Sequence, residues 1–338
     1  MEVRKYDLND QYLHCRKNQL VSYLDYKKIP VDLLFYNALE RSMDVYDSVF
    51  ANRMDRNHYL DKAAPEETLN LLGVTSTHYT MTDFEQLQPE IENGLRTHDI
   101  VFVYGNGRFL DYKLDSYQTK DILHSLAIFK MEQENEGVSY HIFDDIYDGP
   151  TYMSGRDYVH YKVSDKVARE FFINQRDDEG VNLLAKERMT VLDFHPVDQQ
   201  TALAAIQENY AKWLADYDDG FELYKLIPSL VQDESVIGSF NTKEDFFEAI
   251  TQVITLLIGS KKHFIRFLQY TNSSPELITM LEDSISSMEG VRFVLNKIRF
   301  SGRVDLVKLT QKSDLAFNKE QQFLQALRSH TNLNLLTL

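Results

Sequence analysis

The most reactive side chain in this sequence is a single thiol, Cys15, which stands where an apolar helical pattern begins. One thiol forms neither an internal disulfide nor a multi-cysteine metal site, so two roles remain: a nucleophile or a small buried filler. The first turn of a helix offers unpaired backbone N–H groups and the positive end of the helix dipole, and both stabilise a thiolate. Position alone leaves the two roles open.

A cysteine nucleophile needs a base to take its proton and a third group to orient that base. In papain-like proteins the cysteine begins a helix, while the base and its orienting residue lie on later strands. This chain has the same order, with Cys15 first, His124 opening a strand-like run and Asp144 closing the next run. A hairpin between the two runs would bring the imidazole and the carboxylate together. The order predicts catalysis by Cys15, His124 and Asp144.

Other residues compete for these roles. Asp145 is an alternative orienting acid, because strand boundaries read from sequence are uncertain by a residue or more. The remaining candidate bases adjoin the cysteine, lie within strand patterns or precede a proline: His14, His141, His160 and His195. Histidine pairs at metal-ligand spacing are absent from the sequence, and with one cysteine we expect no metal site.

The elements that must position these residues differ between the two halves of the chain. Helical spacing predicts a helix over 15–26 and another after Pro30. Strand-like runs follow, at 100–104, 124–131, 138–144 and 158–163, with a polar turn that predicts a hairpin between the second and third. Later patterns are helical: 165–172, 197–217, 243–258, 261–270, 275–284, 289–299 and 318–329. We expect an α+β first part and an all-helical second part.

Composition narrows the function. The 338 residues carry 36 basic and 52 acidic side chains, a formal net charge of −16, which argues against a nucleic-acid partner. An acidic protein suits a cationic or amine-bearing small substrate, although a solvated acidic surface is the simpler explanation of the charge balance. The N-terminal residues lack an apolar signal region and no stretch is long enough to cross a bilayer, so we expect a cytoplasmic protein without a membrane partner.

Several short motifs resemble the butirosin-biosynthesis acyltransferase N-terminal family, a relative of the bacteriocin-processing cysteine peptidases. They are His14-Cys15 entering a helix, the strand 100–104, Phe109-Leu110-Asp111-Tyr112, 124–128 and Ile142-Phe143-Asp144. The region from about 190 to 330 is similar to the helical domain that usually follows. The resemblance implies a papain-like catalytic domain over 1–165, with an N-terminal helix packed on an antiparallel sheet. It also implies a mainly helical domain over 166–338 that covers the site or docks a carrier protein.

The resemblance further implies acyl transfer: Cys15 would accept an acyl group from an acyl or peptidyl carrier protein and pass it to a small amine. No cofactor is expected beyond the phosphopantetheine arm of the carrier. Gln11 is the candidate oxyanion donor, although it lies closer to the cysteine than in papain-like enzymes. Asn106 and Tyr112 would contact the substrate; the family often has an aspartate at the first position and a proline just before the second, where this chain has Asp111.

Docking an acidic carrier protein would need a local basic patch, since the whole chain is acidic. The sequence offers two candidates, Lys261-Lys262-His263 with Arg266, and Arg299 with Arg303. Two other functions stay open. The same three residues would serve a cysteine peptidase or amidase, and a non-catalytic binding protein would use Cys15 only as filler.

Overall fold

The computed structural model describes residues 2–7, 12–54, 59, 61–81, 83–114, 116–135, 137–145, 157–173 and 188–329. The chain forms two compact units, each assembled from several segments. Unit 1 comprises Met1–Asn9, Leu13–Pro30 and Glu66–Asp198, and unit 2 comprises Asp10–Tyr12, Val31–Pro65 and Gln199–Leu338. The contacts thus assign residues 166–198 to unit 1, whereas the division at residue 165 stays a prediction about separate domains.

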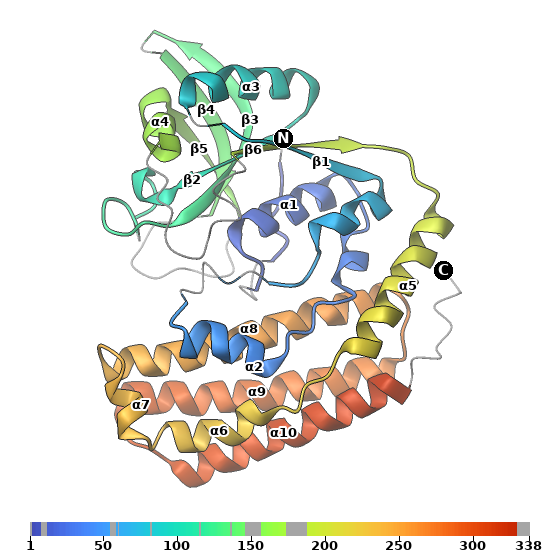
Figure 1. Cartoon of the computed structure of the whole chain (residues 1–338), viewed down its shortest axis with the longest axis vertical. Helices are drawn as coiled ribbons and strands as arrows, with labels where there is room; N and C mark the ends of the chain where they lie inside the picture. Colours follow the sequence, from blue (N-terminus) through green and yellow to red (C-terminus); the bar gives the residue numbers. More distant parts are fainter. Residues whose placement is uncertain are drawn as a thin grey trace. The chain divides into compact units, whose positions relative to one another are not determined.

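Unit 1 is built on an antiparallel six-stranded sheet in the order β1-β6-β2-β3-β4-β5 (Figure 1). The strands are β1 (Val74–Tyr79), β2 (Val101–Asn106), β3 (Leu123–Glu134), β4 (Gly137–Asp144), β5 (Val159–Ser164) and β6 (Met189–Phe194). The helices are α1 (Cys15–Tyr26), α3 (Phe84–Thr97) and α4 (Asp165–Ile173), with short 3-10 turns η4 (Glu66–Leu72) and η5 (Gly107–Phe109). The unit is therefore α+β with an antiparallel sheet, as the sequence predicted.

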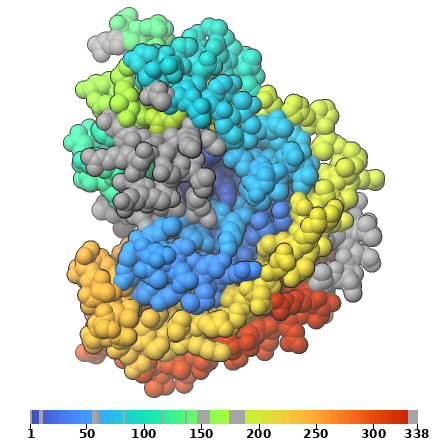
Figure 2. All heavy atoms as spheres, in the orientation of Figure 1, coloured from blue at the N-terminus to red at the C-terminus, as the bar shows by residue number. Residues whose placement is uncertain are grey.

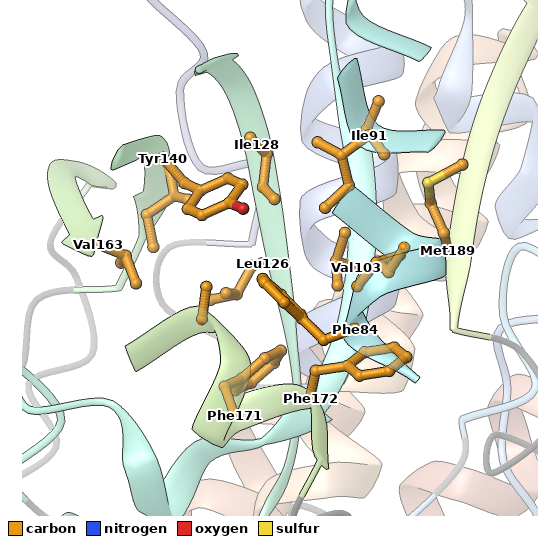
Figure 3. Packing of buried hydrophobic residues seen from close by; sticks show 14 of the residues in the cluster. Phe84, Ile91, Val103, Leu126, Ile128, Tyr140, Val163, Phe171, Phe172 and Met189 are labelled. Carbon is orange, nitrogen blue, oxygen red and sulfur yellow. The ribbon is translucent and has the colours of Figure 1, made fainter. Parts of the chain in front are cut away.

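Helices α3 and α4 pack on one face of the sheet and α1 packs on the other. The strand residues that they contact show this, because successive side chains of a strand point to opposite faces. The core on one face joins α3 and α4 to the strands through Phe84, Phe171, Val103, Leu126 and other buried residues (Figure 3). On the other face the Tyr23 ring of α1 packs against Phe102 and Phe194, which alternate with residues of that core. The helix that carries Cys15 is thus fixed against the sheet.

The predicted hairpin of β3 and β4 is confirmed. Ala127 pairs with Phe143 and Ile128 with Ile142, so the start of β3 lies beside the end of β4. A register shift between Ile128 and Lys130 bends the hairpin beyond these pairs. The pairing brings His124 and Asp144 to the same end of the sheet although twenty residues separate them in the sequence.

Unit 2 is helical, as the patterns predicted. Its elements are η1 (Val31–Phe35), α2 (Ser42–Val45), the π-helical η2 (Tyr46–Ala51), α5 (Gln199–Asp216), α6 (Glu222–Leu230), α7 (Glu234–Gly238), α8 (Lys243–Tyr270), α9 (Pro275–Ser301) and α10 (Leu306–Ser329). The long helices α8, α9 and α10 lie side by side (Figure 1). In the described part of the chain, every helix is too short or too polar to cross a membrane.

The long helices of unit 2 run through positions where the sequence suggested breaks. The predicted helices 243–258 and 261–270 are one helix, since Gly259 and Ser260 are buried inside α8 and the Ser260 hydroxyl donates to the Leu257 carbonyl. Likewise 275–284 and 289–299 are one helix, α9, which begins as predicted with Ser274 as its N-cap and Pro275 in its first turn. Burial against neighbouring helices outweighs the local helix-breaking preference.

Strands β1 and β6 were not predicted. Each is short, only Val74 of β1 is buried, and the paired residues of the two strands lie more than a hundred residues apart in the sequence. The pattern at 192–196 suggested only a turn between a strand and a helix, because Asp193 and His195 interrupt the apolar run. These strands depend on long-range pairing rather than on local pattern.

Gly105 of β2 allows helix α4 to pack closely against the sheet, and a substitution at this position tests that packing. A Cβ atom at this position would lie 2.4 Å from the Phe171 carbonyl oxygen. We expect Gly105→Ala to lower the free energy of unfolding, measured in urea, by about 1–3 kcal/mol. Gly238→Ala is the matched control, since nothing lies within 4 Å of its added Cβ. Equal stability of the two variants would contradict the close packing of α4 on the sheet.

Candidate active site

His124 and Asp144 form a buried pair at the end of the hairpin. The His124 Nε2 atom lies 2.6 Å from Asp144 Oδ2, and both side chains are almost fully shielded from solvent. A carboxylate accepts hydrogen bonds only, so Nε2 carries the proton in this contact. The other ring nitrogen, Nδ1, is then the basic atom of the neutral imidazole.

Cys15 is the first residue of α1, and the N-cap is His14, whose Nδ1 accepts a 3.4 Å hydrogen bond from the Lys17 backbone N–H. The thiol therefore lies at the positive end of the helix, as the sequence predicted. It is partly exposed. A cysteine that served only as filler would be expected to lie fully buried.

The electrostatics of the site favour a thiolate beside an imidazolium. Burial opposes ionisation of Cys15, but the charge of His124 and a hydrogen bond with it, aided by His14, hold the pKa of the thiol well below its usual value. Burial also opposes the charged form of His124, yet the Asp144 carboxylate outweighs it and raises the pKa of the imidazole to about 9. Lys113 partly offsets that rise. Between the two pKa values the proton resides on His124 and the sulfur is the nucleophile.

Asp144 has further partners that hold it ionised. Burial raises the pKa of Asp144, while His124, Lys113 and the Tyr112 hydroxyl lower it, and the net direction is down. The Tyr112 hydroxyl donates to Asp144 Oδ2 at 2.8 Å. Its ring stacks on Tyr161, with ring centroids 3.9 Å apart. The contacts in the structure make Tyr112 a support of the carboxylate, and the substrate contact expected of it stays a prediction.

Gln19 connects the helix of the thiol to the strands of the pair. Its Nε2 lies 3.1 Å from the Ser125 carbonyl oxygen and 3.5 Å from Asp144 Oδ1, and the Ser125 hydroxyl donates to its Oε1 at 2.6 Å. Sequence reasoning missed this residue. A usable signal was present, because a glutamine four residues after Cys15 falls on the same helix face as the thiol.

Of the two candidate acids, Asp144 is the one that contacts His124. Asp145 forms a buried ion pair with Lys5. The Asp145 backbone N–H donates to Asp144 Oδ1 at 2.8 Å, so the second aspartate still helps to orient the first. Asp7 in turn accepts the Leu13 backbone N–H at 3.0 Å and fixes the chain just before Cys15.

Asn106 is also engaged within the chain. Its Oδ1 accepts the backbone N–H groups of Arg108 and Ile122, and its Nδ2 donates to Asp121. These bonds close the loop that leads into β3 and so position His124. The substrate contact expected of Asn106 stays a prediction, and Gln11, the predicted oxyanion donor, lies outside the described residues.

Three other candidate bases have partners elsewhere in unit 1. His141 pairs with Glu132, His195 contacts the Thr75 hydroxyl, and His160 packs against Phe129. Within the residues that the structure describes, no three His, Cys, Asp or Glu side chains gather so that they could hold a metal ion.

The lowered thiol pKa gives a test in the pH dependence of alkylation. Only the thiolate reacts with iodoacetamide, so a lower pKa keeps the rate high as the pH falls. We expect the rate for Cys15 to reach half its plateau well below pH 8.5, the value for an ordinary thiol. In His124→Ala the midpoint should rise towards that value; an unchanged midpoint would show that His124 does not stabilise the thiolate.

The role of Tyr112 can be separated from that of its neighbour. Tyr112→Phe removes a hydrogen bond that stabilises the Asp144 carboxylate, so the pKa of Asp144 should rise. Once Asp144 takes up a proton, the His124 imidazolium loses its counter-charge, so the alkylation midpoint of Cys15 should also move to higher pH. Tyr161→Phe is the matched control, since its hydroxyl donates to the Asp145 carbonyl rather than to Asp144. Equal midpoints in the two variants would contradict the supporting role.

Sequence comparisons with known proteins provide evidence that is independent of the site geometry. No family model matches the chain. A protein of Niallia circulans is 21% identical over 330 residues, which cover 97% of this chain and 99% of the relative. It is named ribostamycin:4-(gamma-L-glutamylamino)-(S)-2-hydroxybutanoyl-[BtrI acyl-carrier protein] 4-(gamma-L-glutamylamino)-(S)-2-hydroxybutanoate transferase. The chain is thus similar, over nearly the whole length of both proteins, to an acyltransferase, which agrees with the resemblance of its motifs to the butirosin-biosynthesis acyltransferases.

Proposed function

We propose that this protein is a cysteine-dependent acyltransferase, which takes an acyl group from a carrier-protein thioester onto Cys15 and transfers it to an amine. The observation that carries the proposal is the buried His124–Asp144 pair beside a thiol whose pKa is lowered. The relative's name adds the substrate class, since that protein moves an acyl group from an acyl-carrier protein.

A papain-like arrangement is part of the proposal. The thiol at the start of α1, the imidazole at the start of β3 and the carboxylate at the end of β4 follow the order of that fold. Helix α1 lies against the sheet, where Gln19 bonds to Ser125 of β3. This support comes from one helix and two adjacent strands of unit 1.

The reaction has two steps: His124 gives up its proton in the first and regains one in the second. The Cys15 thiolate attacks the thioester carbonyl, and the carrier thiol leaves with the proton of the His124 imidazolium. An amine then attacks the acyl-enzyme and gives a proton to the neutral His124, which restores the thiolate–imidazolium pair. The first step exchanges one thioester for another, so it is close to isoenergetic.

Stabilisation of the developing oxyanion falls to backbone and side-chain donors. The Cys15 backbone N–H is one of the unpaired donors of the first helical turn and is the first candidate. Gln11 is proposed as the second donor. Asp144 keeps its charge throughout and holds the ring of His124 in the tautomer that the second step needs.

Intact-mass measurement tests the proposal. Incubation with acyl-loaded carrier protein should add the mass of one acyl group, and Cys15→Ala should add none. Addition of the amine acceptor should remove the adduct and yield an amide. Decay of the adduct by water at the same rate with or without amine would favour the peptidase or amidase. No adduct in the wild type, with activity surviving in Cys15→Ala, would leave a protein that uses Cys15 only as filler.

A further inference from the structure

The end of the α9–α10 hairpin exposes large apolar side chains. Gly302, in the left-handed region with φ 67°, ends α9, and a short connection leads to α10. Around this turn Phe293, Phe300 and Val307 are 63%, 79% and 70% exposed, and Val304 is 42% exposed. Helix α10 forms part of the visible surface of unit 2, coloured red in Figure 2. We refer to these four residues, with the basic side chains described next, as the hairpin-tip surface.

The segment around this turn is basic, although the chain as a whole is acidic. From Arg292 to Lys312 there are six basic residues and one acidic residue, Asp305, a local charge of 6 − 1 = +5 in a chain of net −16. Lys297 and Arg303 are exposed, and Lys308 is partly exposed. Within the described part of the chain, none of these three side chains forms an ion pair with a carboxylate. Their charge is therefore directed at solvent or at a partner.

Apolar and basic side chains are interleaved in this surface. Lys308 Nζ lies 6.0 Å from the centroid of the Phe293 ring, which joins α10 to α9. Phe293, Lys297 and Phe300 are spaced by four and three residues and so share one face of α9. Nearby Arg299 is paired with Glu244 and Glu248 of α8, so it belongs to the helix packing rather than to the free charge.

The other basic patch suggested by the sequence does not form. Lys261 and His263 are buried in α8, and Lys261 is paired with Glu320 of α10 at 3.2 Å. The prediction of a surface patch at 261–266 is wrong in these two residues, because they face a neighbouring helix. Of the two suggested patches, the one around Arg303 remains at the surface.

We propose that the hairpin-tip surface docks the carrier protein that delivers the acyl group; this rests on the proposed function. Carrier proteins of this class are small and acidic. An acidic helix face is complementary to Lys297, Arg303 and Lys308, and apolar side chains in its centre would cover Phe293, Phe300 and Val307. A partner of this kind explains why a strongly acidic chain concentrates unpaired basic residues around exposed aromatic rings.

Direct binding tests the docking separately from catalysis. The probe is the fluorescently labelled, phosphopantetheinylated carrier protein without an acyl group, so binding is measured even if Cys15 is never acylated. We expect the triple variant K297E/R303E/K308E to raise the Kd about tenfold or more, and Phe300→Ser to weaken binding as well. Binding to the wild type should weaken as salt is added. Lys212→Glu, an exposed lysine of α5 paired with Glu208, is the matched control and should bind as wild type.

A second readout separates this inference from the function on which it rests. Acylation of Cys15 is measured with acyl-carrier protein and with acyl-pantetheine, which needs no protein docking. The triple variant should show a higher KM for the acyl-carrier protein and an unchanged rate with acyl-pantetheine. Wild-type binding and KM in the triple variant would overturn the docking proposal. So would sedimentation showing that the surface pairs two copies of this chain and that the variant abolishes only that pairing. Failure of both thioesters to acylate Cys15 would overturn the proposed function, while the binding experiment still decides the docking.

Discussion

The buried contact between His124 and Asp144 is the interaction on which the site depends. An isolated carboxylate so well shielded from water would be costly, and the imidazolium, Lys113 and the Tyr112 hydroxyl offset that cost. Removing one member of such a pair leaves an uncompensated charge, a loss of about 3–5 kcal/mol in comparable cases. The carboxylate raises the pKa of His124, and the imidazolium lowers that of Cys15. Asp144 thus favours ionisation of the Cys15 sulfur through one intervening imidazole ring.

The fold of unit 1 supports this contact from several directions. The β3–β4 register brings the histidine and the aspartate to one end of the sheet, and Gln19 holds α1 to the same place. The loop before β3 is closed by Asn106, and the chain before Cys15 is fixed by Asp7. Asn106 and Tyr112, which the sequence suggested as substrate contacts, thus also support the pair from within the chain. A nucleophile at a helix start needs such supports, since small shifts of the base remove the hydrogen bond that activates it.

Much of this site could be predicted from the sequence, because its members follow local rules. Cys15 begins a helical pattern, and His124 and Asp144 lie on strong strand patterns joined by a short turn. What could not be predicted depends on contacts between distant segments. Strand β6 is recognisable only through its pairing with β1 and β2, and the burial of Lys261 only through Glu320. Local pattern also placed breaks inside α8 and α9, where packing maintains continuous helices.

In the proposed mechanism the acyl group passes through Cys15 on its way to the amine. Rapid-quench kinetics of a single turnover test it most directly, with acyl-carrier protein and amine mixed against excess protein. We expect acyl-Cys15 to form and then decay at the rate at which the amide appears, and we expect neither species in Cys15→Ala. Amide that appears before acyl-Cys15, or at a faster rate than the adduct decays, would contradict it.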